Sequence, residues 1–174
     1  VPVIGAFLLP LIGKVSERAR NGAASLFVLA PLLASALMVP TVLSGATVTI
    51  SYALPLGFSF VLAADALAVF MAIVSSFISL IIVIYSFDYI SHYPNRTEYY
   101  TMVVLFIGSM MGLVFSANLI FIYIFWEITA LTSWRLIGFF REKSYVMKAD
   151  KAFLVTVFGA LLMLMGFILL YAQT

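Results

Sequence analysis

Long apolar runs separated by short polar stretches make up most of this sequence. Six of these runs predict transmembrane helices, because a span needs about 20 apolar residues and its backbone must satisfy its own hydrogen bonds in lipid. The predicted helices cover residues 1–13, 23–43, 66–90, 99–115, 119–140 and 152–171. The first run reaches only about 20 Å as a helix, which is less than the ~30 Å core of a bilayer.

Residues 46–60 follow a different pattern. Polar and apolar side chains alternate from Thr47 to Tyr52, which is the two-residue period of a strand, and Pro55 and Gly57 then break the run. We therefore predict a short extended segment, or a hairpin, outside the membrane between the second and third helices.

Short polar connections join the other helices. Residues 14–20, 91–98 and 141–151 are predicted as charged loops, and residues 116–118 as a tight turn. Asp65 precedes an apolar run and is well placed to cap the helix that follows it. There is no long linker, so the simplest interpretation is one all-α, multi-pass membrane domain over residues 1–174.

The positive charges predict an orientation. All nine lysines and arginines lie in or beside alternate connections: after the first helix, between the third and fourth, and between the fifth and sixth. Loops rich in lysine and arginine stay in the cytoplasm. The charged loops are therefore expected on the cytoplasmic side of a cell membrane, with both chain ends outside.

Composition excludes several kinds of chemistry. The chain is 65% hydrophobic and 9% charged, which indicates a lipid bilayer as its environment and gives no sign of nucleic-acid binding. It has no cysteine and one histidine, so neither a thiolate site nor a histidine metal cluster is expected. No phosphate loop, dinucleotide fingerprint or nucleophile–base set is present. We predict no catalytic residue, no cofactor and no metal in this chain.

Glu127 is the residue that most suggests a function. It lies near the middle of the predicted fifth helix, where a charged side chain costs about 2.5–3.5 kcal/mol on insertion scales. Such an acid should face protein or water, and it often belongs to an ion pathway. The alternative is a protonated glutamate that only packs against a neighbouring helix.

Other candidates for an ion pathway lie near Glu127 or at the charged face. Thr129 and Ser133 lie within two turns of Glu127 and could line a hydrated path, although such hydroxyls often bond to carbonyls of their own helix. Lys148 and Lys151 precede the sixth run, either as interfacial anchors or at the mouth of a path from the cytoplasm.

Three further features concern packing rather than ion transport. Arg135 lies eight residues after Glu127, about 12 Å along the helix, so it cannot pair with that acid and is expected to extend to the cytoplasmic face. Trp126 and Trp134 are expected to serve in packing or as interface anchors. Gly108 and Gly112 predict a small-residue face for close helix packing.

Several motifs together resemble the antiporter-like membrane subunits. These subunits occur in respiratory complex I (as its subunit 5), in Mrp-type sodium/proton antiporters (as their A component) and in energy-converting hydrogenases. The motifs that carry the resemblance are Asp65–Leu67, Tyr85–Tyr89, Ala117–Ile120, Phe125–Thr129, Leu136–Phe139 and Lys151–Gly159. The likeness covers nearly the whole chain and corresponds to the N-terminal portion of one such polypeptide.

The resemblance implies a role in proton or sodium translocation. In the family, the glutamate that matches Glu127 pairs with a lysine on the seventh helix, which this chain does not contain. The expected partners are other membrane subunits, a chain that supplies the missing C-terminal helices, and the subunits of a redox module. The alternative is a structural scaffold subunit that conducts no ions.

Overall fold

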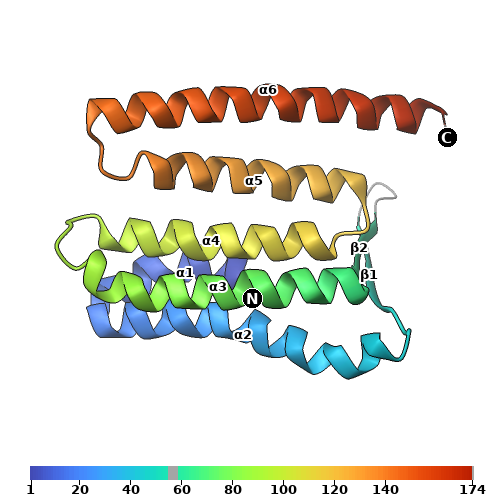
Figure 1. Cartoon of the computed structure of the whole chain (residues 1–174), viewed down its shortest axis with the longest axis horizontal. Helices are drawn as coiled ribbons and strands as arrows, with labels where there is room; N and C mark the ends of the chain where they lie inside the picture. Colours follow the sequence, from blue (N-terminus) through green and yellow to red (C-terminus); the bar gives the residue numbers. More distant parts are fainter. Residues whose placement is uncertain (55–58, 174) are drawn as a thin grey trace.

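The computed structural model describes residues 1–54 and 59–173, which form six helices and one hairpin of two strands (Figure 1). The elements are α1 (Pro2–Val15), α2 (Glu17–Leu43), β1 (Val48–Ala53), β2 (Ser59–Ala64), α3 (Ala66–Tyr89), α4 (Arg96–Phe115), α5 (Leu119–Ile137) and α6 (Lys143–Gln173).

Five of the helices, α2 to α6, are long and apolar enough to cross a membrane, and α1 is apolar but shorter. The predicted all-α, multi-pass architecture is therefore confirmed. Pro31 and Pro40 both lie inside α2, as expected for a membrane helix whose neighbours can compensate for the lost hydrogen bonds.

The predicted loop over residues 141–151 is wrong. α6 begins at Lys143 and continues for 31 residues, about 46 Å, so it is longer than a bilayer core. Residues 143–151 contain no glycine or proline, and their backbone stays helical beyond the apolar run. α2 likewise begins at Glu17, within the predicted loop over residues 14–20.

The helices lie side by side with their connections at two ends (Figure 1). The α1–α2, α3–α4 and α5–α6 connections share one end, here named the charged end, and the hairpin and the α4–α5 turn lie at the other end. α4 packs against α1, α3 and α5, whereas α6 packs chiefly against α5. The largest buried cluster joins α1, α2, α3 and α4 and includes Leu9, Val28, Val83, Val104 and Ile107.

Gly108 and Gly112 allow this close packing, as predicted. A Cβ atom at Gly108 would lie 2.8 Å from the backbone nitrogen of Val3, and one at Gly112 would overlap the Phe125 ring. Both glycines therefore pack inside the chain, where they bring α1 and α5 onto α4.

The predicted extended segment is a hairpin. β1 and β2 pair antiparallel, from Val48 opposite Ala64 to Ala53 opposite Ser59. The hairpin also contacts the α4–α5 turn, because the Ala117 amide donates to the Val61 carbonyl at 2.9 Å. The predicted break at Pro55 and Gly57 lies outside the described residues. After β2, Asp65 caps α3 by accepting a hydrogen bond from the Ala68 amide at 2.7 Å, as expected.

Candidate functional site

Glu127 lies in the middle of α5, on a side of the helix that this chain leaves uncovered. It is half-buried, and Ile120, Ile124 and Leu131 share its side of the helix at intervals of seven, three and four residues. These three side chains are 47%, 43% and 49% exposed. The carboxyl group therefore lies midway along a helix long enough to cross a membrane, next to a surface on which another element can pack.

Tyr123 is the partner of Glu127 within this chain. It lies one turn earlier on α5, and its hydroxyl group interacts with the Glu127 carboxylate. Among residues 1–54 and 59–173, no ion pair involves Glu127. The sequence interpretation missed Tyr123, although the four-residue spacing from Glu127 was a signal that could have found it.

Thr129 and Ser133 line a groove between α4, α5 and α6 with a volume of about 290 Å³. Thr156 of α6 also lines the groove, together with apolar side chains such as Phe106 and Met110. Thr129 and Ser133 follow Glu127 by two and six residues, which places them on a different side of α5 at about 100° per residue. The structure therefore brings these two hydroxyls together but separates them from Glu127.

The hydroxyl groups in this groove differ in their partners. Thr129 donates to the Trp126 carbonyl at 2.6 Å and Thr156 to the Ala152 carbonyl at 2.9 Å, so both bond to their own helix. For Thr129 this is the alternative that the sequence left open. Within the described part of the chain, no hydrogen bond involves the Ser133 side chain. Its hydroxyl group is therefore available to bind a molecule or ion in the groove.

Lys148 and Lys151 form a group that is separate from Glu127. They line a hollow on the first turns of α6, together with Lys143. Nearby, the indole nitrogen of Trp134 donates to Asp150 at 2.9 Å and so joins α5 to α6. The predicted site residues thus form three groups rather than one continuous path within this chain.

Arg135 binds an acid on α4. Its guanidinium group pairs with Glu98, and Arg141 pairs with the other oxygen of Glu98 at 2.8 Å. This agrees with the expectation that Arg135 does not reach Glu127. The link between the first turn of α4 and the last turn of α5 was not predicted.

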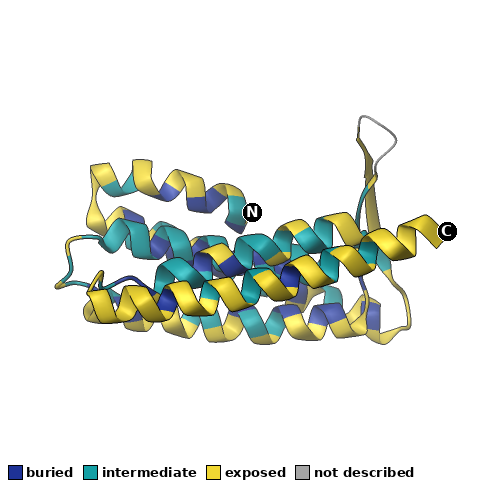
Figure 2. Cartoon of the chain, turned by 90° about the horizontal axis from the view of Figure 1, so that it is seen from above, coloured by how far each residue is buried: buried dark blue, intermediate teal, exposed yellow. Residues whose placement is uncertain are grey.

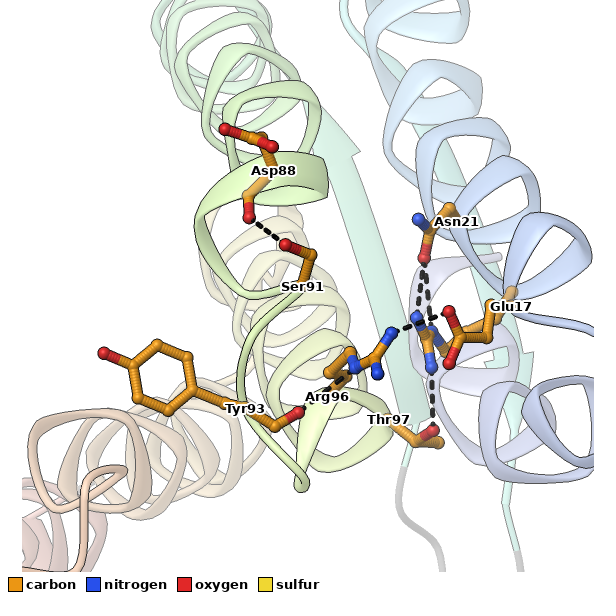
Figure 3. Close-up of polar contacts among 8 residues, drawn as sticks. Glu17, Asn21, Asp88, Ser91, Tyr93, Arg96 and Thr97 are labelled. Atoms are coloured by element: carbon orange, nitrogen blue, oxygen red, sulfur yellow. Dashed lines mark hydrogen bonds and ion pairs between the residues drawn. The ribbon is translucent and has the colours of Figure 1, made fainter.

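A second polar cluster joins α2 to α4 at the charged end (Figure 3). Arg96 pairs with Glu17 at 2.6 Å and also donates to the Tyr93 carbonyl at 3.1 Å. Arg20 lies beside this pair and is only 4% exposed, although sequence alone placed it in a charged loop.

Buried Arg20 is held by neutral groups. Its guanidinium donates twice to Asn21 Oδ1, at 3.0 and 3.2 Å, and once to Thr97 Oγ1 at 3.2 Å. It also lies 5.1 Å from the centre of the Tyr100 ring, which suits a cation–π contact. Among the described residues, no ion pair involves Arg20.

Two family models match the chain in sequence. The model described as NADH-ubiquinone oxidoreductase (complex I), chain 5 N-terminus, matches residues 51–100. The model described as NADH:quinone oxidoreductase/Mrp antiporter, TM, matches residues 116–174. The second match includes all of α5 and α6, and therefore Glu127.

Curated relatives match over nearly the whole chain. The A1 subunit of a Na(+)/H(+) antiporter from Staphylococcus haemolyticus is 34% identical over 174 residues, which is 98% of this chain. The A1 subunit from Staphylococcus aureus is 35% identical over 181 residues and covers 100% of this chain. The chain spans only 22% of the length of each of these relatives.

Two solved structures share the fold. One is the membrane-bound sulfane sulfur reductase, an archaeal respiratory membrane complex. One of its chains superimposes on this chain with a TM-score of 0.88 at 20% sequence identity. The match covers 99% of this chain and 36% of the reductase chain. A chain of the Mrp complex from Dietzia sp. superimposes on this chain with a TM-score of 0.78 at 23% sequence identity. The match covers 95% of this chain and 18% of the Mrp chain.

Proposed function

Since this chain belongs to the antiporter-like membrane subunits and corresponds to the N-terminal portion of one, we propose that it contributes part of a proton or sodium pathway in a larger membrane complex. The single observation that carries this proposal is the half-buried Glu127 in the middle of α5. An acid at this depth is costly, and a role in moving cations explains why it is there.

The surroundings of Glu127 support a relay that is completed by another element. Tyr123 is its polar neighbour in this chain, and the exposed side of α5 on which both lie leaves room for a second helix. A basic residue on that helix would stabilise the carboxylate, and its movement would favour proton uptake or release. We propose that this helix comes from the part of the protein, or from the separate polypeptide, that corresponds to the remainder of the longer relatives.

The other predicted path residues take secondary roles in this proposal. Ser133 and Thr129 line the groove between α4, α5 and α6, which offers a place for water or a cation beside α5. Lys148 and Lys151 lie at the charged end, where we place the cytoplasmic mouth of the path on the basis of the positive-inside rule. The redox module subunits expected from the family resemblance are a further part of the proposal.

The test is Glu127→Gln in the intact protein with its accompanying subunits. Glutamine keeps the shape of the side chain but cannot titrate, so cation-coupled transport measured in everted membrane vesicles should fall at least tenfold. Glu142→Gln is the matched control, because Glu142 is an exposed acid at the charged end and should leave transport unchanged.

Unchanged transport by the Glu127→Gln variant would favour the alternative, a structural scaffold subunit. One observation favours that alternative independently. A Cβ atom added at Gly159 or Gly166 on α6 would have no other atom within 4 Å, so these glycines leave notches where another helix can pack closely.

A further inference from the structure

The first turns of α6 carry three lysines on one side of the helix. At about 100° per residue, Lys143, Lys148 and Lys151 fall within an arc of less than half a turn. All three are exposed and surround a hollow of about 400 Å³ that Ser144 and Met147 also line. We name these five residues the lysine face.

The positive charge of the lysine face is not neutralised by the described part of the chain. Among residues 1–54 and 59–173, no ion pair involves any of the three lysines, and the Lys148 ammonium group lies 5.7 Å from the centre of the Tyr145 ring. The adjacent Asp150 accepts the hydrogen bond from Trp134 instead. The start of α6 adds the positive end of the helix dipole, so the hollow attracts an anion.

The lysine face continues into an exposed apolar surface along α6. Leu154, Phe158, Leu162 and Met165 follow Lys151 on the same side of the helix and are 67%, 66%, 57% and 61% exposed. Figure 2 shows α6 as largely exposed along its length, up to the C-terminus. A basic hollow at one end of a helix long enough to cross a membrane, next to an exposed apolar surface, matches a phospholipid, which has a charged headgroup and apolar chains.

We propose that the lysine face binds an anionic phospholipid. Its phosphate group lies in the hollow between Lys143, Lys148 and Lys151, and its acyl chains lie along Leu154 and Phe158. An acidic protein segment would match the lysines but not the apolar surface below them, and free phosphate would use the lysines alone. This inference shares Lys148 and Lys151 with the proposed ion pathway, but lipid binding can be measured without transport, so the two proposals can fail separately.

The experiment measures phospholipid retention by the protein purified in mild detergent with the subunits that accompany it. The probe is phosphatidylglycerol, titrated into delipidated protein and counted by native mass spectrometry. In the variant that combines Lys143→Gln with Lys151→Gln, we expect the affinity for phosphatidylglycerol to fall about 25-fold, since each lysine near an anionic headgroup contributes about fivefold. The combination of Lys143→Arg with Lys151→Arg keeps the charge and should retain the lipid.

A matched control combines Lys14→Gln with Arg18→Gln, which removes two exposed charges from the same end of the molecule. This control should retain phosphatidylglycerol. Equal affinity in the lysine-face variant and the control would overturn the proposal. So would displacement of the lipid by millimolar inorganic phosphate, which would indicate a phosphate site, or cross-linking of Lys148 to an acidic segment of another polypeptide in place of lipid.

Discussion

Glu98 joins the first turn of α4 to the last turn of α5 by accepting from Arg135 with one carboxylate oxygen and from Arg141 with the other. The two arginines are 37 and 43 residues away along the chain. One acid therefore balances two cations that would otherwise repel each other at the end of α5.

Glu98→Gln should lower the stability of the protein. The Glu98 side chain is 26% exposed, and each pair at such a partly exposed position contributes about 0.2–1 kcal/mol. The loss should appear as a fall of a few degrees in the thermal unfolding midpoint, followed in detergent by tryptophan fluorescence. Asp88→Asn is the control, because Asp88 is exposed and its carboxylate makes no ion pair with the described residues. Equal shifts for both variants would argue against the bridge.

Gly108→Ala should be strongly destabilising. The added methyl group would meet the Val3 backbone nitrogen at 2.8 Å and the Pro2 carbonyl carbon at 3.2 Å, so α1 would have to move away from α4. Overpacking of this kind costs about 1–3 kcal/mol. Gly22→Ala is the matched control, since Gly22 is an exposed position inside α2 with no neighbouring atom within 4 Å of an added Cβ, and alanine favours a helix. Thermal unfolding of both variants measures the difference, and a neutral Gly108→Ala would contradict the packing of α1 on α4.

Arg20→Lys should destabilise the contact between α2 and α4. A lysine ammonium lacks the planar fork that reaches Asn21 and Thr97 together, although it keeps the charge. The loss of such charged hydrogen bonds in a buried position corresponds to roughly 1.5–3 kcal/mol. Arg18→Lys, two residues earlier and exposed, should have no effect. Limited proteolysis at the charged end would report the loosening, and equal cleavage of the two variants would refute the role of Arg20.

Tyr123→Phe should reduce transport without abolishing it. The substitution removes the hydroxyl group beside Glu127 and leaves the ring in place, so the carboxylate loses one polar partner within the chain. We expect a loss of about tenfold or less, smaller than that of Glu127→Gln, in everted vesicles. Tyr85→Phe on the exposed side of α3 is the control. A Tyr123→Phe variant as active as the control would separate Tyr123 from the pathway.

The sequence was sufficient to predict the membrane helices, the hairpin and the position of Glu127 in the middle of α5. Hydrophobicity decides which residues can cross a bilayer, and a charge within such a run is visible without any structure. The same criterion explains the error at residues 143–151. Hydropathy marks the part of a helix that lies in hydrocarbon, whereas the helical backbone of α6 continues beyond it because water can solvate its lysines.

The polar contacts between helices could not be predicted in this way. Arg20 was expected in a charged loop, yet it is buried beside Thr97, 77 residues later in the chain. Glu98 likewise pairs with Arg135, which is distant in the sequence. In both cases the packing of the helices brings their ends together. By contrast, the partner of Glu127 is local, since Tyr123 lies one turn away. The orientation in the membrane and the roles of Lys148, Lys151, Thr129 and Ser133 stay predictions.

The small contact area between α6 and the other helices has a consequence for membrane insertion. Its buried residues among those described are two alanines, Ala149 and Ala160, and it packs chiefly against α5. Lipid gives little incentive for helices to associate, so a helix that buries so few residues is held chiefly by local contacts such as the hydrogen bond from Trp134 to Asp150. During synthesis α6 would enter the bilayer as the last of these spans. Its rotation about its own axis would become fixed only when neighbouring polypeptide packs against it.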